Sequence, residues 1–291
     1  MALLSVALEL AAIVLTMLVT AALVIVGPRR LVAAFRDFRW RLEVAALPLA
    51  VLASVLVLRW GTADVLPRLS ERVIGIRITG LLFEFERTLF GQSPVAVLQS
   101  FQTPELTSFF VFIYIYGYAF LLLFPFVAYF ALEEMDELST LILAYTVNYG
   151  IGLVCYVLFI AFGPRNFDTL LFEDVLYSAF PESGYLTYTV NESTNVFPSL
   201  HTSMAMTTFF LAILSRKQYP LWVPVSGFIA ISVVVSTMYL GIHWFSDVAA
   251  GIALAAISVY VGVNYSIHGI VRTLQLYIGS QLEDDGTTGS R

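Results

Sequence analysis

The sequence predicts an all-α integral membrane protein, a polytopic bundle of about seven transmembrane helices. Two observations predict this class. Hydrophobic residues make up 59% of the chain, its mean hydropathy is +0.84, and only 12% of its residues are charged, whereas a soluble domain carries about 25%. In addition, apolar runs of roughly 17 to 26 residues alternate with polar turns, and runs of this length cross a bilayer as helices.

The composition also narrows the function. The formal net charge is −6, which argues against nucleic-acid binding because that function needs a basic face. Cys155 is the only cysteine, so neither an internal disulfide nor a cysteine-based metal site is expected. The expected partner of this chain is the membrane, not nucleic acid.

Residues 4–26 form the first expected span. They are apolar except for Glu9 and end at Gly27-Pro28. A cleaved signal peptide would have a basic start and a shorter apolar core, so we interpret this run as a transmembrane helix. The next loop is rich in arginine: Arg29, Arg30, Arg36, Arg39 and Arg41. The positive-inside rule makes this loop cytoplasmic and puts the N-terminus outside; binding of anionic lipid is a compatible additional role.

Residues 42–59 form the second span, and the segment 61–104 is mixed in character. Between Ile74 and Leu89, apolar residues recur at helical spacing while charged residues such as Glu84 occupy other angles. This pattern predicts an amphipathic helix at the membrane surface. Two interpretations stay open: an ordinary packed surface helix, or a lid or side wall for a lipid substrate.

The later apolar runs predict the remaining spans, at residues 106–131, 138–162, 199–215, 221–240 and 245–265. The loop 163–198 is long for a membrane connection, and long loops are often functional. Residues 271–291 form an acidic tail that we expect to be disordered.

Because successive spans cross the membrane in opposite directions, the cytoplasmic position of the first basic loop fixes the side of the membrane on which every other loop lies. The cytoplasmic side then holds Arg29–Arg41, Glu133–Glu137, Arg216-Lys217 and Arg272. The opposite side holds the loop 163–198 and His243. We therefore expect a multi-pass protein of the cell membrane whose two candidate histidines, His201 and His243, lie on the extracytoplasmic side.

Two stretches contain most of the candidate chemistry, Asn195–Ser203 (NVFPSLHTS) and Tyr239–Asp247 (YLGIHWFSD). Each lies where a polar segment meets a long apolar one. In the second stretch, His243 and Asp247 are four residues apart, so on a helix they share a face. The carboxylate can then hold one imidazole nitrogen and leave the other free as a nucleophile or base.

In the first stretch, His201 follows Pro198-Ser199. A proline at the start of a helix leaves backbone N–H groups free to meet an anion. Two histidines, one carboxylate and a helix N-terminus are suitable groups for phosphoryl transfer without a metal, so no cofactor is expected.

These stretches resemble motifs of the type 2 phosphatidic acid phosphatase (PAP2) superfamily. Pro198-Ser199-Leu200-His201 is similar to the second motif of that superfamily, and His243-x-x-x-Asp247 resembles the end of its third motif. Leu200 in the first of these motifs and the run Ser236–His243 are most similar to the inositolphosphotransferase branch, which includes inositol phosphorylceramide synthase-like proteins. The resemblance covers roughly Tyr145 to Val263.

The resemblance implies an organisation of the chain. Residues 42–270 would form a PAP2-like membrane domain with a six-helix core. Residues 1–41 would add a further N-terminal helix and the basic loop.

The resemblance also implies roles for three residues. His243 would be the nucleophile that forms a phosphohistidine, Asp247 would hold its Nδ1–H, and His201 would be the general acid. Simpler interpretations stay open: an interface histidine capped by an aspartate, and a helix-start histidine bonded to a carbonyl group.

Further residues would bind the phosphate. Ser199 and the backbone of Leu200-His201 are candidates for its oxygens, although Ser199 can equally cap the helix. The first motif of the superfamily ends in an arginine-proline pair after a lysine, whereas this chain has Gly163-Pro164-Arg165-Asn166. Arg165 is the candidate phosphate ligand, the alternative being an ordinary loop arginine.

The third motif departs from the family at one position. Ser236-Thr237 stands where the superfamily usually has Ser-Arg, so Thr237 is the substrate-binding candidate there. The missing positive charge suits a phosphodiester better than a phosphomonoester, in agreement with the transferase branch.

We therefore expect an enzyme that acts on a lipid phosphate or a phospholipid head group. A lipid or polyprenyl phosphate phosphatase without transferase activity is the alternative. A transporter with a His/Asp relay would need polar residues at the midplane of several spans, and a scaffold protein would not need both histidines and the aspartate.

Overall fold

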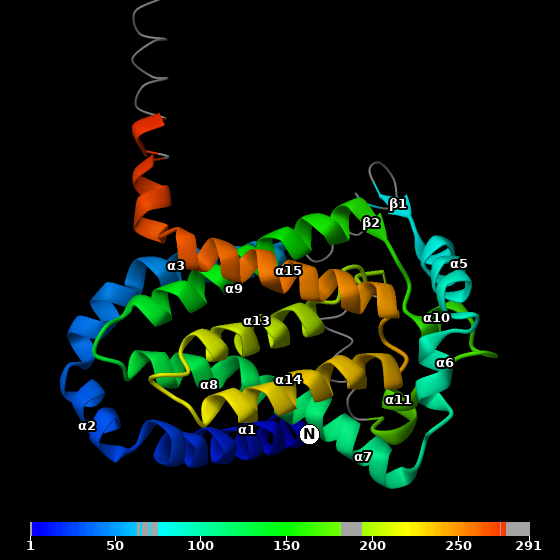
Figure 1. Cartoon of the computed structure of the whole chain (residues 1–291), viewed down its shortest axis with the longest axis horizontal. Coiled ribbons are helices and arrows are strands. Elements are labelled where there is room, and N and C mark those ends of the chain that lie inside the picture. Colours follow the sequence, from blue (N-terminus) through cyan, green and yellow to red (C-terminus); the bar gives the residue numbers. More distant parts are fainter. Residues whose placement is uncertain are drawn as a thin grey trace, which may run out of the picture.

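The structure is a computed structural model that describes residues 2–62, 65, 70, 75–181, 194–273 and 275–277. Helices dominate this part of the chain (Figure 1). Among the described residues, six segments are long and apolar enough to cross a membrane: Leu4–Val26, Phe38–Gly61, Pro104–Phe130, Asp136–Leu158, Trp222–Tyr239 and Phe245–Asn264. This confirms the predicted all-α polytopic class.

Two of these spans combine several helical elements. Helix α1 (Ala2–Ala21) continues into the π-helix η1 (Ala22–Val26). The span that starts at Pro104 joins α7 (Pro104–Phe112), the π-helix η3 (Ile113–Gly117) and α8 (Tyr118–Phe130). The other spans are the single helices α3 (Phe38–Gly61), α9 (Asp136–Leu158), α14 (Trp222–Tyr239) and α15 (Phe245–Asn264). Their ends lie within a few residues of the predicted ones.

The run predicted at 199–215 forms a shorter helix, α13 (Leu200–Leu214), of 15 residues. At 1.5 Å per residue it is about 22 Å long, less than the roughly 30 Å hydrocarbon core of a bilayer. Helix α13 lies inside the bundle and packs against α15, α14, α9 and α8 (Figure 1). Because protein surrounds it, α13 does not need the length of a lipid-facing span.

Buried polar side chains fix α13 against α9. The hydroxyl of Ser203 donates to Oδ1 of Asn148 at 2.7 Å, and Nδ2 of Asn148 donates to the hydroxyl of Thr207 at 3.1 Å. The hydroxyls of Tyr145 and Thr208 lie 2.6 Å apart. Hydrogen bonds of this kind hold helices together in a membrane. Here they fix the rotation of α13, the helix that contains His201.

Glycines allow the central helices to approach closely. A Cβ atom on Gly251 of α15 would lie 2.6 Å from the carbonyl oxygen of Ser199, and one on Gly152 of α9 would lie 2.4 Å from the side chain of Leu200. Real Cβ contacts are not this short, so a side chain at Gly251 would force the helices apart, and one at Gly152 would displace the side chain of Leu200. These contacts bring the start of α13 against α15.

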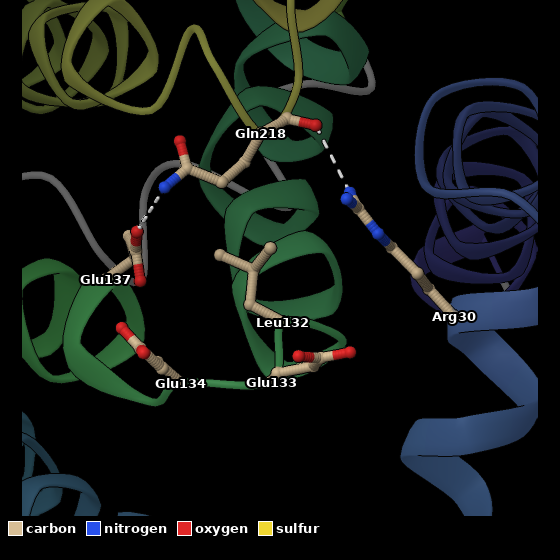
Figure 2. Close-up of a pocket in the computed structure, with 6 residues that line it drawn as sticks. All are labelled: Arg30, Leu132, Glu133, Glu134, Glu137 and Gln218. Carbon is tan, nitrogen blue, oxygen red and sulfur yellow. Dashed lines mark hydrogen bonds between the residues drawn. The ribbon is translucent and has the colours of Figure 1, made fainter.

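One end of the bundle holds the loops predicted to be cytoplasmic. Helix α2 (Pro28–Arg36) carries Arg30, whose Nη1 donates to the carbonyl of Gln218 at 3.1 Å, and Nε2 of Gln218 donates to Glu137 at 2.8 Å (Figure 2). Arg41 is buried and donates to the carbonyls of Phe130 and Leu132. The basic loop, the acidic turn and the turn after α13 therefore share one end, as predicted.

Short elements cover the opposite end (Figure 1). They are β1 (Ile76–Arg77), α5 (Thr79–Phe90), α6 (Pro94–Gln99), β2 (Phe159–Ile160), α10 (Pro164–Phe167) and α11 (Val175–Ala179). Strands β1 and β2 pair in parallel, which joins the segment before α5 to the end of α9. This covered end contains both candidate histidines.

The predicted amphipathic helix is confirmed only in part. It corresponds to α5, but Ile76-Arg77 form a strand and Ile74 lies outside the described residues. Its apolar stripe faces outward, since Leu81, Phe85 and Leu89 are 68%, 56% and 58% exposed. At the start of the predicted disordered tail, residues 271–273 and 275–277 are helical, and residues 274 and 278–291 lie outside the described residues.

Candidate active site

His243 lies in the turn that joins α14 to α15. The turn reverses at Gly241, whose φ of +74° is unfavourable for other residues. The backbone N–H groups of Ile242 and His243 both donate to the carbonyl of Thr237, at 3.0 and 3.1 Å. The end of α14 therefore fixes the backbone of this histidine.

Asp247 lies beside the His243 ring. Its Oδ2 is 3.6 Å from Nδ1 of His243, and the two side chains are 0% and 3% exposed. The same oxygen accepts a hydrogen bond of 2.8 Å from the backbone N–H of Trp244. Because α15 begins at Phe245, the proximity predicted from the spacing arises from the first turn of α15 and the residues before it, not from a shared helix face.

Trp244 anchors this turn in the protein. Its side chain is 0% exposed, and its Nε1 donates to the carbonyl of Phe162 at 2.8 Å. The rings of Phe83, Phe167 and Phe172 surround the indole, with ring centroids 5.3 to 5.9 Å away. Trp244, the residue directly after His243, is thus held in an aromatic cluster.

His201, the second residue of α13, faces His243. The centroids of the two imidazole rings are 6.1 Å apart. The ring of Tyr114 stacks on His201 at 4.7 Å, and that of Tyr118 lies 4.8 Å away. Both tyrosines come from the span formed by α7, η3 and α8. The two histidines are close enough to contact one small group between them.

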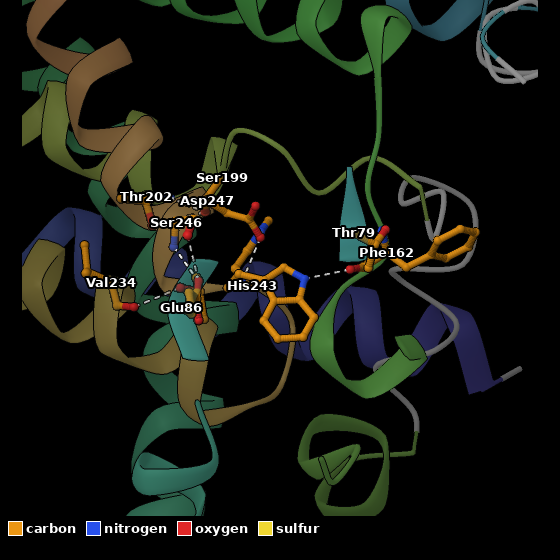
Figure 3. A network of polar contacts seen from close by, with 11 residues as sticks. Thr79, Glu86, Phe162, Ser199, Thr202, Val234, His243, Ser246 and Asp247 are labelled. Carbon is orange, nitrogen blue, oxygen red and sulfur yellow. Dashed lines mark hydrogen bonds and ion pairs between the residues drawn. The ribbon is translucent and has the colours of Figure 1, made fainter. Parts of the chain in front are cut away.

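Ser199 joins the two predicted motifs. Its hydroxyl accepts a hydrogen bond from the backbone N–H of Thr202 at 3.3 Å, which confirms its role as the cap of α13. Its own N–H donates to the carbonyl of Asp247 at 3.0 Å. The start of α13 is thereby bonded to the first turn of α15 (Figure 3).

Leu200 and Thr237 contribute through packing and backbone. The side chain of Leu200 packs against Tyr156 and Leu254. The hydroxyl of Thr237 donates to the carbonyl of Val234 at 2.8 Å. Thr237 therefore has a structural position in the last turn of α14, and a substrate contact by either residue remains a prediction.

The loop with Arg165 docks on the same turn. A Cβ atom on Gly163 would lie 2.3 Å from the carbonyl oxygen of Ile242, and the N–H of Arg165 donates to the carbonyl of Gly241 at 3.0 Å. The Arg165 guanidinium lies 3.1 Å from Asp174 and over the ring of Tyr177. The backbone of Arg165 therefore lies against the turn that carries His243, while its guanidinium is paired with Asp174; a phosphate contact by Arg165 stays a prediction.

Burial determines the charge of His243. Removal of the ring from water lowers the pKa of His243 to about 3; a backbone contact with Val196 opposes this shift, and the Arg165 guanidinium adds to it. The imidazole is therefore neutral at neutral pH and has a lone pair available.

Three residues near the site were not predicted. Tyr114 and Tyr118 lie in the aromatic third span, which the sequence indicates only as lipid-facing or core packing. The third is Glu86, which is 0% exposed in α5. No local signal in the sequence marked Glu86, because only the structure shows that its face of α5 packs inward.

No metal centre is evident around these residues. Within the described part of the chain, no group of three or more His, Cys, Asp or Glu side chains lies close enough to hold a metal ion.

Comparison with known protein families matches residues 81–261 to the PAP2 superfamily. The chain belongs to the PAP2 superfamily. The match begins inside α5 and ends inside α15, so it includes both histidines, Asp247 and Glu86. No curated protein and no solved structure gives a significant match. PAP2 membership supports phosphatase-type phosphoester chemistry for this chain.

Proposed function

We propose that this PAP2 protein is a membrane lipid phosphotransferase or phosphatase that acts through a phosphohistidine on His243. Its substrate is a lipid phosphate or a phospholipid head group at the outer membrane face. The observation that carries the proposal is the facing pair of rings, His201 and His243, 6.1 Å apart and with Asp247 beside Nδ1 of His243.

In the first step, Nε2 of neutral His243 attacks phosphorus. The N–P bond forms as the P–O bond to the leaving group breaks, and His201 gives its proton to the departing oxygen. Nδ1 keeps its proton, so the phosphorylated ring is cationic and the Asp247 carboxylate stabilises it. Burial supports this step because it keeps the attacking nitrogen unprotonated.

In the second step, water or an alcohol attacks phosphorus. The attacking oxygen gives its proton to His201 and the N–P bond breaks, which restores neutral His243. With water, a phosphomonoester substrate gives free phosphate and a phosphodiester gives a phosphomonoester, whereas an alcohol such as an inositol takes up the phosphoryl group as a new phosphate ester. N–H groups at the start of α13 are suited to bind the phosphate oxygens.

The charge around the site favours the transferase. Arg165 shares its charge with Asp174 at 3.1 Å, and Thr237 stands where the superfamily usually has an arginine. A phosphodiester carries less negative charge than a phosphomonoester and needs less compensation. This supports a reaction of the inositolphosphotransferase type, with a lipid phosphatase as the alternative.

A transporter is less well supported. The buried polar groups between α9 and α13 are hydroxyls and an amide that bond to one another. A proton or ion relay instead uses ionisable groups along its path.

The test uses the purified full chain in lipid vesicles. Phosphatidate, polyprenyl diphosphate and phosphatidylinositol are compared as substrates, with and without inositol as acceptor. Acid-labile phosphate is trapped on the protein in a single turnover. We expect trapping by the unaltered protein, none by His243→Ala, and normal trapping by His268→Ala, which changes the exposed third histidine.

Two further measurements test the mechanism. Activity should persist in EDTA and be inhibited by vanadate, which mimics pentacoordinate phosphorus. Loss of activity in EDTA that Zn²⁺ or Mg²⁺ restores would indicate a metal-dependent route. Phosphate trapped on His243→Ala but not on His201→Ala would reverse the two roles.

A further inference from the structure

Glu86 is a buried carboxylate that the catalytic steps do not use. It lies in α5, where its neighbour Phe85 is 56% exposed but Glu86 itself is 0% exposed. A carboxylate is costly to bury unless hydrogen bonds compensate for lost water. The position of Glu86 on the inward face of a surface helix therefore requires a reason.

The contacts of Glu86 supply that reason. Its Oε1 accepts hydrogen bonds from the backbone N–H of Ser246 at 2.7 Å and from the Ser246 hydroxyl at 2.9 Å (Figure 3). Ser246 is in the first turn of α15. N–H groups in a first turn have no partner within the helix, and a negative group there is favoured by the helix dipole.

The same turn carries Asp247. Ser246 is bonded to Glu86, while the Asp247 carboxylate accepts from the N–H of Trp244 at 2.8 Å. Two carboxylates therefore hold this turn, one from α5 and one from α15 itself. Burial raises the pKa of Glu86, and the like charge of Asp247 raises it further, whereas the hydrogen bonds from Ser246 lower it.

A local capping residue is the usual solution at a helix start. Here the bond to the Ser246 N–H comes from a residue 160 positions away in the chain, and Oε2 of Glu86 has no hydrogen-bond partner among the described residues. A neutral local cap would satisfy the helix with less desolvation. What Glu86 adds is a fixed position for the turn relative to α5.

We propose that Glu86 is a positioning residue: by holding the first turn of α15, it keeps the Asp247 carboxylate beside Nδ1 of His243. This inference rests on the proposed function of His243. Helix α5 was predicted to be either an ordinary surface helix or a wall for a lipid substrate. On this proposal one face of α5 is exposed and apolar, and the opposite face supports the active site.

The test compares Glu86→Ala with Glu86→Gln in the full chain. Alanine removes the acceptor, whereas glutamine keeps one carbonyl oxygen for Ser246. A misplacement of about 1 Å can reduce a rate by about 10²-fold. We expect Glu86→Ala to slow phosphoenzyme formation by about that factor, with little change in KM. Glu86→Gln should recover most of the rate.

Thr79→Val is the matched control. Thr79 is also buried in α5, and its hydroxyl accepts from the N–H of Phe162 at 3.0 Å, but it does not bond to Ser246. This variant loosens α5 and releases the N–H of Phe162, whose carbonyl still accepts from Trp244, but it keeps the bond from Glu86 to α15. Its rate should therefore stay well above that of Glu86→Ala. An equal loss in Thr79→Val would mean that general docking of α5 matters, and it would overturn the role of Glu86.

A double-mutant cycle tests whether Glu86 acts through Asp247. In an Asp247→Asn background, Glu86→Ala should cause little additional loss. Full additivity would contradict the proposal. If Glu86→Ala does not fold, Glu86→Asp replaces it in these tests, because it keeps the charge but withdraws the carboxylate. An unaltered rate in that variant would contradict positioning.

Nitrogen NMR of the histidine rings supplies a measurement that does not depend on activity. Asp247 beside Nδ1 should keep the proton of His243 on that nitrogen. Glu86→Ala should give a mixture of tautomers, and Glu86→Gln should not. If the unaltered protein traps no phosphate but the tautomers still shift, the proposed function fails and the positioning role stands. If neither rate nor tautomer changes in folded Glu86→Ala, the positioning role fails.

Discussion

At the scale of single residues, the separation of His243 and Asp247 is informative. The 3.6 Å between Nδ1 and Oδ2 exceeds the usual hydrogen-bond length of about 2.7 to 3.2 Å. Catalytic hydrogen bonds are often long without substrate and shorten in the reacting complex. A cationic phosphohistidine would attract the carboxylate more strongly than the neutral ring does.

The charge state of His243 leads to a first prediction. The ordinary pKa of histidine is roughly 6.5. Because burial lowers the pKa of His243 to about 3, the folded protein binds no proton on this ring until the pH is well below that ordinary value. The unfolded chain does bind one, so His243 removes stability as pH falls through that interval. Nitrogen NMR of the ring should show neutral imidazole from pH 8 to pH 5. A titration of His243 near pH 6.5 would contradict the prediction.

His201 leads to a second prediction, about leaving groups. A general acid contributes roughly 10²- to 10⁴-fold, and most for a leaving oxygen that needs the proton. His201→Ala should therefore lose far more activity on an alkyl ester than on a p-nitrophenyl ester. The measurement is the first-step rate with both substrates. An equal loss on both would assign His201 a role other than proton donor.

At the scale of helices, the contact between α13 and α15 determines the site. The first turns of the two helices meet where Ser199 bonds to the carbonyl of Asp247. Gly251 permits this approach, because a Cβ there would lie 2.6 Å from the Ser199 carbonyl oxygen. The geometry between the two histidines thus depends on a residue that belongs to neither motif.

Gly251→Ala should separate these helices. Overpacking of this kind costs about 1 to 3 kcal/mol, and the displaced start of α13 should also reduce phosphoenzyme formation. Thermal unfolding in detergent and single-turnover rates measure the two effects. Gly150→Ala in α9 is the control, since a Cβ there meets nothing within 4 Å. Equal behaviour of the two variants would contradict this account of the helix contact.

At the scale of the whole molecule, the two ends of the bundle differ in character. One end is tied together by Arg30, Arg41 and Gln218. Short elements cover the other end (Figure 1), which contains the two candidate histidines. Helices α1 and α3 precede the family match and pack against α8 and α9. The basic loop between them is the basis for the predicted orientation.

Cysteine labelling tests the orientation. In a Cys155→Ala background, Leu170→Cys lies at the histidine end, where Leu170 is 96% exposed. A membrane-impermeant maleimide should label it on intact cells. Arg216→Cys, at the other end, should be labelled only after the membrane is opened. The reverse pattern would place the active site on the cytoplasmic side.

Much of the architecture could be predicted from the sequence because hydropathy is a local property. The spans appear as apolar runs, and α15 extends over 245–264 against a predicted 245–265. The paired motifs that resemble a known superfamily indicated that His201 and His243 belong to one site. The spacing of four residues predicted that His243 and Asp247 lie close together, but the turn before α15, not a shared helix face, brings them together.

Only the tertiary structure decided which distant residues join the site. Glu86 bonds to Ser246 across 160 positions, and Tyr114 stacks on a histidine in another helix. Such contacts depend on how helices rotate and cross, which glycines and buried hydroxyls set through packing. Local sequence patterns specify that a residue is in a helix and how polar it is, but the partner of a buried face is specified by the whole bundle.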